Sequence, residues 1–274
     1  MANSDNFSKV SVIIPTKNSA RTIGVCLEGI KEQDYKGEVE IIVVDNYSTD
    51  ETLSIAKKFT ENIYSSGPER SAQRNLGAQK SVGEYLSFLD ADMILSKGVI
   101  SECVERMKNQ DILAFYIPEK ILGESFWLRV RDFERSFYNA TVVDCVRFVR
   151  RESFLKIGGF DENLTGPEDW DFDRRINQVG KTDITESFLI HNEINFDLQR
   201  FLKKKHYYSQ AFGRYIEKWG RDDPIVKKQL GGQYRLFGVF FERGKWKKLL
   251  RHPGLTLGMY GLRFLVGINY ILTR

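Results

Sequence analysis

The sequence has few cysteines, and its first residues do not resemble a secretion signal. Its three cysteines, Cys26, Cys103 and Cys145, are widely spaced and odd in number, so they match neither a disulfide framework nor a zinc-binding pattern. We expect them to be small buried side chains in a reducing cytoplasm. The first ten residues lack the basic and apolar regions of a secretory signal, so we expect the protein to work inside the cell.

Two further absences narrow the class of protein. No Gly-x-Gly-x-x-Gly follows the first apolar run, which argues against a dinucleotide-binding site. The net charge is only +4, and although the last third of the chain is basic we expect no nucleic-acid partner. The 274 residues, 42% of them hydrophobic, are enough for a large core. We assign that core to residues 1–200 and treat residues 201–274 as a helical C-terminal extension.

Strand-like and helix-like patterns alternate through the first ninety residues. β-branched runs at 10–15 and 39–45 and the apolar run from Tyr85 predict strands, and a short segment around Ile63 could add another. Helical patterns cover 20–33, 49–60 and 71–81, and we expect Ser48 or Thr49 to cap the second of these. The alternation predicts an α/β fold with a doubly wound, mostly parallel sheet flanked by helices.

Two carboxylates, Asp90 and Asp92, end the strand that begins at Tyr85. Ligands of open α/β sheets bind beyond the carboxyl ends of the strands, so both side chains are expected at a ligand site. Paired oxygen donors suit a divalent cation such as Mn²⁺ or Mg²⁺, which in turn favours a diphosphate ligand. An acidic strand-to-loop turn remains the alternative interpretation.

Four segments together resemble a known family. They are VSVIIPTKN, VVDNYSTDET, AQRNLGAQKSVGEYLSFLDAD and GPEDWDFDRRI, and they lie in this order between residues 10 and 176. In that order they are similar to the signature of the family 2 glycosyltransferases, which are inverting enzymes of the GT-A fold. The resemblance implies a GT-A fold and transfer of a sugar from a UDP- or GDP-sugar to a hydroxyl group.

The same resemblance implies which residues meet the nucleotide sugar. These are Pro15, Thr16, Asn18, Asp45, Arg70, Arg74, Asp90 and Ala91. Among them, Asp45 is expected to accept a hydrogen bond from the base, and Arg74 is favoured over Arg70 as the arginine that reaches the nucleotide. A carboxylate at this place would discriminate between bases by accepting from an N–H edge. A turn-forming role for Asp45 remains open.

For the metal, the resemblance implies Asp92 as a direct ligand and Asp90 as a contact to the ribose or, through water, to the cation. His191 follows an apolar strand-like stretch, and some relatives have a histidine near this place that reaches the metal or the diphosphate. Neutral imidazole is an ordinary ligand for Mn²⁺. A purely structural histidine is the alternative.

The acidic run that begins at Gly166 supplies the candidate base. By resemblance, Asp169 takes the proton from the acceptor hydroxyl, with Glu168 as the fallback base, while Asp171 and Asp173 need no role beyond complementing a helix N-terminus. The chain has no Gln-x-x-Arg-Trp motif of the processive members, so transfer of a single sugar is preferred over polymer synthesis.

The C-terminal segment is basic and then apolar. Residues 245–251 carry Trp246 among lysines and arginines, and residues 254–272 contain one charge, Arg263. A central Arg costs at least ~2.5 kcal/mol in a bilayer, so we expect residues 245–274 to lie on a membrane surface rather than cross it. A helix packed on the sheet and a dimer contact are the alternatives.

By resemblance, such a tail accompanies a lipid-linked or envelope-glycan acceptor, which places the protein at the inner face of the cell membrane. An oligomer is left open. Two rival functions also remain: an inactive nucleotide-sugar-binding scaffold, and a sugar nucleotidyltransferase. The first is disfavoured because the expected acidic positions are filled, and the second because PTKNSA follows the first strand in place of a Gly-rich basic loop.

Overall fold

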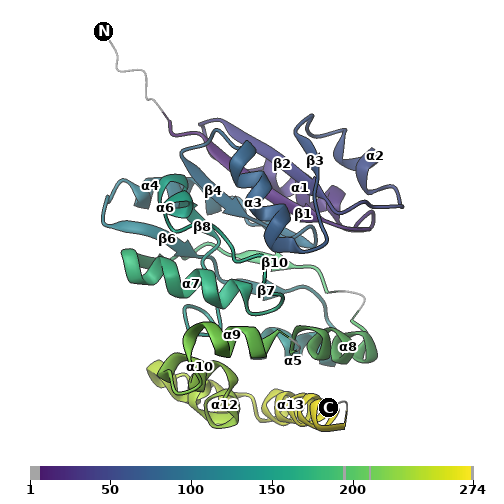
Figure 1. Cartoon of the computed structure of the whole chain (residues 1–274). Helices are drawn as coiled ribbons and strands as arrows, with labels where there is room; N and C mark the ends of the chain where they lie inside the picture. The colour runs from purple at the N-terminus through teal and green to yellow at the C-terminus, as the bar shows by residue number, and fades with distance from the viewer. Residues whose placement is uncertain (1–6, 194–195, 210, 273–274) are drawn as a thin grey trace.

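A computed structural model describes residues 7–193, 196–209 and 211–272, and it has a sheet-rich half and a layer of helices (Figure 1). The N-terminal elements are β1 (Val10–Thr16), α1 (Ile23–Lys31), β2 (Val39–Asp45), α2 (Thr52–Ala56), β3 (Ile63–Ser65), α3 (Arg70–Lys80), β4 (Tyr85–Phe88), β5 (Met93–Leu95) and α4 (Val99–Met107). The middle of the chain forms β6 (Ile112–Tyr116), β7 (Glu119–Ile121), α5 (Phe126–Arg135), β8 (Phe148–Arg150), α6 (Arg151–Lys156), α7 (Glu168–Val179), β9 (Lys181–Ile184) and β10 (Leu189–His191). The C-terminal part is helical: α8 (Leu198–Ser209), α9 (Phe212–Trp219), α10 (Pro224–Leu230), a π-helical turn (Tyr234–Gly238), α11 (Val239–Phe241), a 3₁₀ turn (Glu242–Gly244), α12 (Trp246–Arg251) and α13 (Pro253–Leu272).

The central sheet has seven strands in the order β3-β2-β1-β4-β8-β6-β9. β1 pairs in parallel with β2 and β4, β2 with β3 and β6 with β9, while β8 runs antiparallel to both of its neighbours. The prediction of a mostly parallel sheet flanked by helices is therefore confirmed.

Hydrophobic clusters cover both faces of this sheet. Val12 and Ile14 of β1 pack in one cluster with Leu27 of α1, whereas the intervening Ile13 packs in a second cluster with Ala78 of α3 and Phe172 of α7. Successive side chains of a strand point to opposite faces, so the consecutive apolar residues 12–14 of β1 are what a strand covered on both sides requires.

A small second sheet extends the fold beyond the carboxyl ends of the main strands. Its order is β5-β10-β7, with β10 antiparallel to β5 and parallel to β7. The register sets His191 opposite Met93 on one side and Ile121 on the other. Because Met93 follows Asp92 directly, this sheet brings His191 next to Asp92. We call the carboxylates Asp90 and Asp92, which follow β4, the acidic rim.

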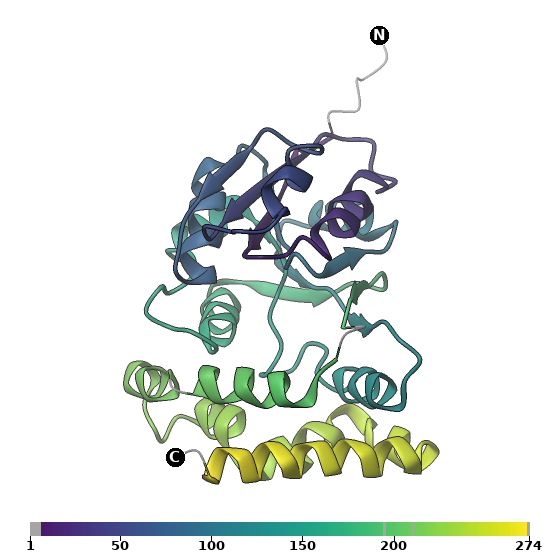
Figure 2. The same cartoon turned by 90° about the vertical axis from the view of Figure 1, so that its right-hand side faces the viewer.

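The helical layer lies at the end of the molecule opposite the N-terminal strands, with α13 along its outer edge (Figure 2). Val130, Phe133 and Phe137 form a separate core there with Phe240 and Met259. The tail therefore packs on α5 and the residues just after it rather than on the sheet. Within the described residues, we find no helix that is both long and apolar enough to span a bilayer.

One local prediction was wrong. Helix α2 begins at Thr52, and neither Ser48 nor Thr49 caps it. Ser48 instead bonds to Asp45 and accepts from the backbone N–H of Asn18, and Thr49 donates to the Asn18 side chain. These bonds hold residues 45–49 against the loop after β1 and delay the start of the helix.

Candidate functional site

The predicted nucleotide residues gather at the carboxyl edge of β1, β2 and β4. Thr16, the last residue of β1, pairs with Asp45, the last residue of β2, and Ile13 pairs with Phe88 of β4. Pro15, Thr16 and Ala91 are buried there, and the Thr16 hydroxyl has no hydrogen-bond partner among the described residues. Their contacts with a donor remain predictions.

The loops after β1 and β2 hold each other through Asp45. This buried carboxylate accepts from the backbone N–H of Ser48 at 2.8 Å and from its hydroxyl at 2.5 Å. Asn18, at φ 49°, donates its backbone N–H to the Ser48 oxygen at 2.7 Å. Asp45 thus forms the turn that was its alternative role, and both of its oxygens are engaged; a bond to a base would use their remaining lone pairs.

Helix α3 supplies two buried side chains that tie the site together. The Gln73 amide donates to the carbonyls of Thr16 and Val44, at 3.0 and 2.6 Å, and so joins the ends of β1 and β2. The Arg74 guanidinium donates to Asp90 at 2.9 Å and to Asp169 at 2.7 Å. Its side chain is only 1% exposed, so the direct role of Arg74 in this structure is to join the two carboxylates.

Arg70, one helical turn earlier, completes the ion-pair network. It lies 3.6 Å from Asp90 and 3.1 Å from Glu168, with its guanidinium over the Tyr208 ring. Burial would raise the pKa of Asp90, but Arg74 and Arg70 outweigh it and hold that pKa well below its usual range. Asp90 is consequently an anion fixed at the rim.

Helix α7 presents its first turn to this network. Glu168 is buried, its carboxylate accepts from the backbone N–H of Gly166, and burial together with the nearby Asp169 raises its pKa. Asp169 bonds to Arg74 and is 30% exposed, so part of its carboxylate is open to solvent. Asp171 and Asp173 are buried and point elsewhere: Asp171 bonds to Arg175 and Trp219, and Asp173 to Tyr116. Only the first two acids of the run thus face the network.

Asp92 and His191 form the other end of the site. The His191 Nε2 atom lies 3.2 Å from Asp92 Oδ2, and its Nδ1 atom lies 2.8 Å from Glu119 Oε1. A backbone bond from Asn192 to the Asp92 carbonyl, at 2.8 Å, fixes this pairing. Burial would lower the pKa of His191, but Asp92 and Glu119 raise it to about 10.

This end of the site fits a divalent cation in part. Asp92 offers an oxygen, and His191 offers its Nε2 nitrogen once a bound cation displaces the proton that the flanking carboxylates favour there. Across the described ranges, however, no three His, Cys, Asp or Glu side chains converge to hold a metal on their own. Further ligands would have to come from a substrate or from water.

The sequence interpretation missed several residues that organise the site. Gln73 bridges two strands, Glu119 holds His191, and Phe160 lies against the Arg74 guanidinium at 5.0 Å. Gln73 was within a motif used for the resemblance, but the other two are in segments without periodicity or charge pattern. Only their contacts in the folded structure identify these two residues.

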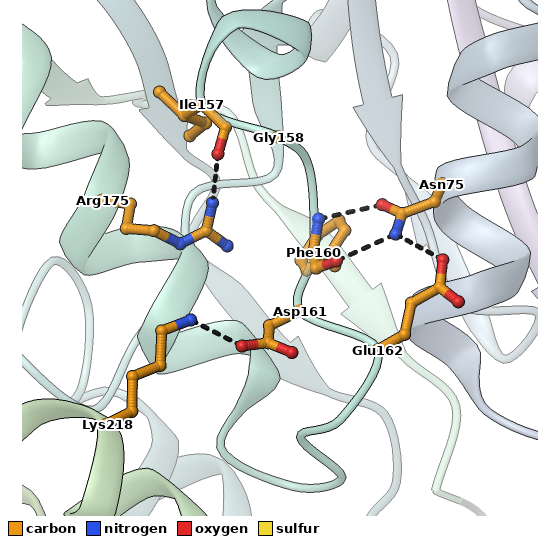
Figure 3. A pocket seen from close by; sticks show the side chains of 8 residues that line it. All are labelled: Asn75, Ile157, Gly158, Phe160, Asp161, Glu162, Arg175 and Lys218. Atoms are coloured by element: carbon orange, nitrogen blue, oxygen red, sulfur yellow. Dashed lines mark hydrogen bonds and ion pairs between the residues drawn. The ribbon is translucent and has the colours of Figure 1, made fainter.

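A separate hollow of about 410 Å³ opens beside Phe160, between α3 and α7 (Figure 3). Its charged groups bond to one another or to the backbone: Lys218 to Asp161 at 2.6 Å, Asn75 to Glu162 at 2.8 Å and Arg175 to the Ile157 carbonyl. Because these side chains satisfy each other, the hollow offers a ligand little unpaired charge.

Comparison with known proteins points to one family. Residues 11–160 match the family described as glycosyl transferase family 2. The chain is 35% identical over 104 residues to poly(ribitol-phosphate) beta-N-acetylglucosaminyltransferase TarS of Staphylococcus aureus, a match that covers 34% of this chain and 18% of TarS. It is 29% identical over 178 residues to a PGL/p-HBAD biosynthesis glycosyltransferase of Mycobacterium bovis, covering 60% of this chain and 68% of the relative.

Solved structures give the same fold. The mannosyltransferase PcManGT of Pyrobaculum calidifontis, in complex with GDP-Man and Mn²⁺, superposes with a TM-score of 0.64 at 20% identity and covers 98% of this chain and 86% of its own. TarS 1-349 in complex with UDP-GlcNAc superposes with a TM-score of 0.57 at 19% identity, covering 93% and 80%. At this identity the likeness establishes the fold alone.

The fold and its acidic rim define a GT-A-type glycosyltransferase domain. The match over more than half of the chain makes the assignment specific: this protein belongs to glycosyl transferase family 2.

Proposed function

We propose that this protein is a metal-dependent, inverting glycosyltransferase that moves one sugar from a UDP- or GDP-sugar to a hydroxyl group of a lipid-linked or envelope-glycan acceptor. The observation that carries the proposal is the bridge made by Arg74, which bonds to Asp90 in the loop just after β4 and to Asp169 at the start of α7. The acidic rim and the candidate base therefore belong to one connected set of ion pairs.

Asp169 is the proposed general base. It is the more exposed of the two acids in the first turn of α7, and Arg74 orients it. It would accept the proton of the acceptor hydroxyl while that oxygen attacks the anomeric carbon, from the face opposite the leaving diphosphate. The buried Glu168, bonded to Arg70, would keep the start of the helix in place.

Asp92 and His191 are the proposed protein ligands of a Mn²⁺ or Mg²⁺ ion, with Asp90 acting through water. When bound, such an ion neutralises the charge that develops on the departing nucleoside diphosphate. Support comes from the facing Asp92 and His191 side chains and from PcManGT, whose structure contains GDP-Man and Mn²⁺. TarS binds UDP-GlcNAc, so the base of the donor is left as uridine or guanosine.

The acceptor and the location form a further part of the proposal. Leu257, Phe264 and Ile268 make an exposed stripe on α13, and Leu250 with Arg251 stands exposed on α12. Apolar and basic side chains exposed together suit a surface with anionic headgroups. We place this layer against the inner face of the cell membrane, where a lipid-linked acceptor would reach the site.

The test is product identity. With Mn²⁺ present, incubation with UDP- and GDP-sugars should release nucleoside diphosphate when an acceptor is added, and Asp169→Asn should abolish that release. Pyrophosphate as the product would instead indicate a sugar nucleotidyltransferase. Tight donor binding with no turnover on any lipid-linked or glycan acceptor would favour an inactive nucleotide-sugar-binding protein.

A further inference from the structure

Glu119 is a buried carboxylate that lies directly behind His191. It is the first residue of β7, is 8% exposed, and lies 2.8 Å from His191 Nδ1. Two arginines fix it from behind, Arg135 at 3.1 Å and Arg147 at 3.5 Å. The carboxylate therefore contacts two guanidinium groups as well as the His191 ring.

The contact between Glu119 and His191 Nδ1 fits a hydrogen bond that the ring donates, because a carboxylate beside two arginines is an acceptor. A hydrogen bond from Nδ1–H to Glu119 fixes both the orientation of the ring and the side on which the other nitrogen lies. That nitrogen, Nε2, faces Asp92 Oδ2 at 3.2 Å. A carboxylate behind a metal-binding imidazole in this way aligns the ring and increases its basicity.

The surroundings of His191 reinforce this orientation. Glu193 lies 3.7 Å from the same Nδ1 atom and is held by Arg131 through two bonds of 2.9 and 3.1 Å. Arg131 and Arg135 both belong to α5. One helix thus fixes the two carboxylates that stand behind the histidine.

We propose that Glu119, held by Arg135 and Arg147, is a positioning residue that aims His191 Nε2 at the metal end of the donor site and so sets how strongly a divalent cation tightens donor binding. This rests on the proposed function, because Asp92 and His191 are taken as the protein ligands. In this proposal β7 and α5 contribute to donor affinity, although both lie outside the four sequence motifs.

The experiment is calorimetric titration of the intact protein with UDP and GDP, each with and without Mn²⁺, which reads binding rather than turnover. Glu119→Gln and Glu119→Asp should each weaken the Mn²⁺-dependent gain in affinity by about 10–100-fold and leave metal-free binding unchanged. The Asp variant keeps the charge that Arg135 and Arg147 need but withdraws the oxygen from His191, so it covers the case in which the Gln variant does not fold.

Two controls separate positioning from general damage. Asp144→Asn removes another carboxylate of Arg135, at 2.8 Å, that has no contact with His191, and it should keep the Mn²⁺ effect. In a His191→Ala background, Glu119→Gln should have no further effect on Mn²⁺-dependent binding, since the ring it positions is gone.

The outcomes are distinguishable. If the wild-type chain binds neither nucleotide, or binds without Mn²⁺ dependence, the proposed function and this inference fail together. If His191→Ala loses the Mn²⁺ effect while both Glu119 variants keep it within two-fold, or if Asp144→Asn loses as much as they do, only the positioning role of Glu119 is overturned.

Discussion

The acidic rim and the C-terminal helical layer each bury an arginine, but they use it differently. At the rim, Arg74 holds Asp90 and Asp169, and Asp169 remains 30% exposed. In the layer, Arg263 of α13 pairs with Glu134 of α5 at 3.0 Å, and both side chains are 9% exposed. Arg263 also bonds to the Tyr138 hydroxyl and the Arg235 carbonyl.

The two arginines therefore have different roles: Arg74 organises the candidate site, and Arg263 holds one helix against another. Arg74 presents carboxylates that a ligand can meet, whereas Arg263 closes its ion pair inside and pins α13 to α5. Outward, the same helix exposes Leu257 and Phe264, at 75% and 69%. Substitutions at the rim should therefore change chemistry with the fold intact, and substitutions on the outer face of α13 should change association with the chemistry intact.

The largest effect is expected for Asp169→Asn. An amide cannot take the proton of the acceptor hydroxyl, so transfer should fall by ~100-fold or more. Donor binding should persist, because Arg74 can still donate to the amide oxygen. Initial rates of nucleoside diphosphate release, together with donor binding by calorimetry, measure the two effects separately. A dead Glu168→Gln beside an active Asp169→Asn would exchange the roles of these residues.

A smaller effect is expected for Asp92→Asn. Loss of the charged oxygen that faces His191 should remove the Mn²⁺-dependent tightening of nucleoside diphosphate binding, by about 10-fold or more, at an unchanged melting temperature. Calorimetric titration with and without Mn²⁺ measures this. An intact Mn²⁺ dependence would show that the metal end of the site has been assigned to the wrong carboxylate.

Substitutions on the outer face of α13 should change membrane association and leave nucleotide binding intact. Leu257→Ser with Phe264→Ser should reduce flotation with anionic vesicles several-fold and leave nucleotide binding unchanged, because both side chains face outward. Arg251→Gln should reduce the salt-sensitive part of vesicle binding. Unchanged flotation in all three substitutions would favour a soluble acceptor. Point substitutions are preferable to ending the chain near Gly244, which would uncover Val130 and Phe133.

The same contrast shows how far the sequence could lead. Long β-branched runs and helical spacing predicted β1, β2, β4, α1 and α3, because local periodicity is strong in elements that are buried on a defined face. β5, β7 and β10 have three residues each, too few for a period to show. Periodicity therefore could not predict the second sheet. The resemblance placed His191 near the metal with Asp92, but no sequence pattern indicated its contact with Glu119.

Periodicity also could not tell which face of the last helix is covered. Arg263 was interpreted as a charge at a membrane surface, but its partner Glu134 lies far away in the sequence. Asp45 shows the same limit on a shorter scale, since the bonds that engage it come from Ser48 in its own loop. Motif order selected the candidate residues of the site, and only tertiary contacts show which groups each of them bonds.

The smallest predicted effect concerns Asp173, which lies on α7 one helical turn after Asp169 but faces the core. Burial, with Asp144 and Asp169 nearby, raises its pKa to about 8, although Tyr116 and the Val146 N–H donate to it. The usual value for an unfolded chain is about 4. The folded protein thus binds a proton at Asp173 that the unfolded chain releases.

The sign follows from this difference. The contribution of Asp173 to the free energy of unfolding is full below pH ~4 and is lost as the pH rises through about 8, with a slope of at most ~1.4 kcal/mol per pH unit. Asp173→Asn keeps the shape and the acceptor oxygen of the neutral acid, so its urea stability should decline less than that of the wild type between pH 5 and pH 8. Parallel pH profiles would mean that Asp173 is ionised in the fold. Because the group faces away from the rim, nucleoside diphosphate binding should be the same in both proteins, which again separates the packed part of α7 from the first turn that carries the proposed base.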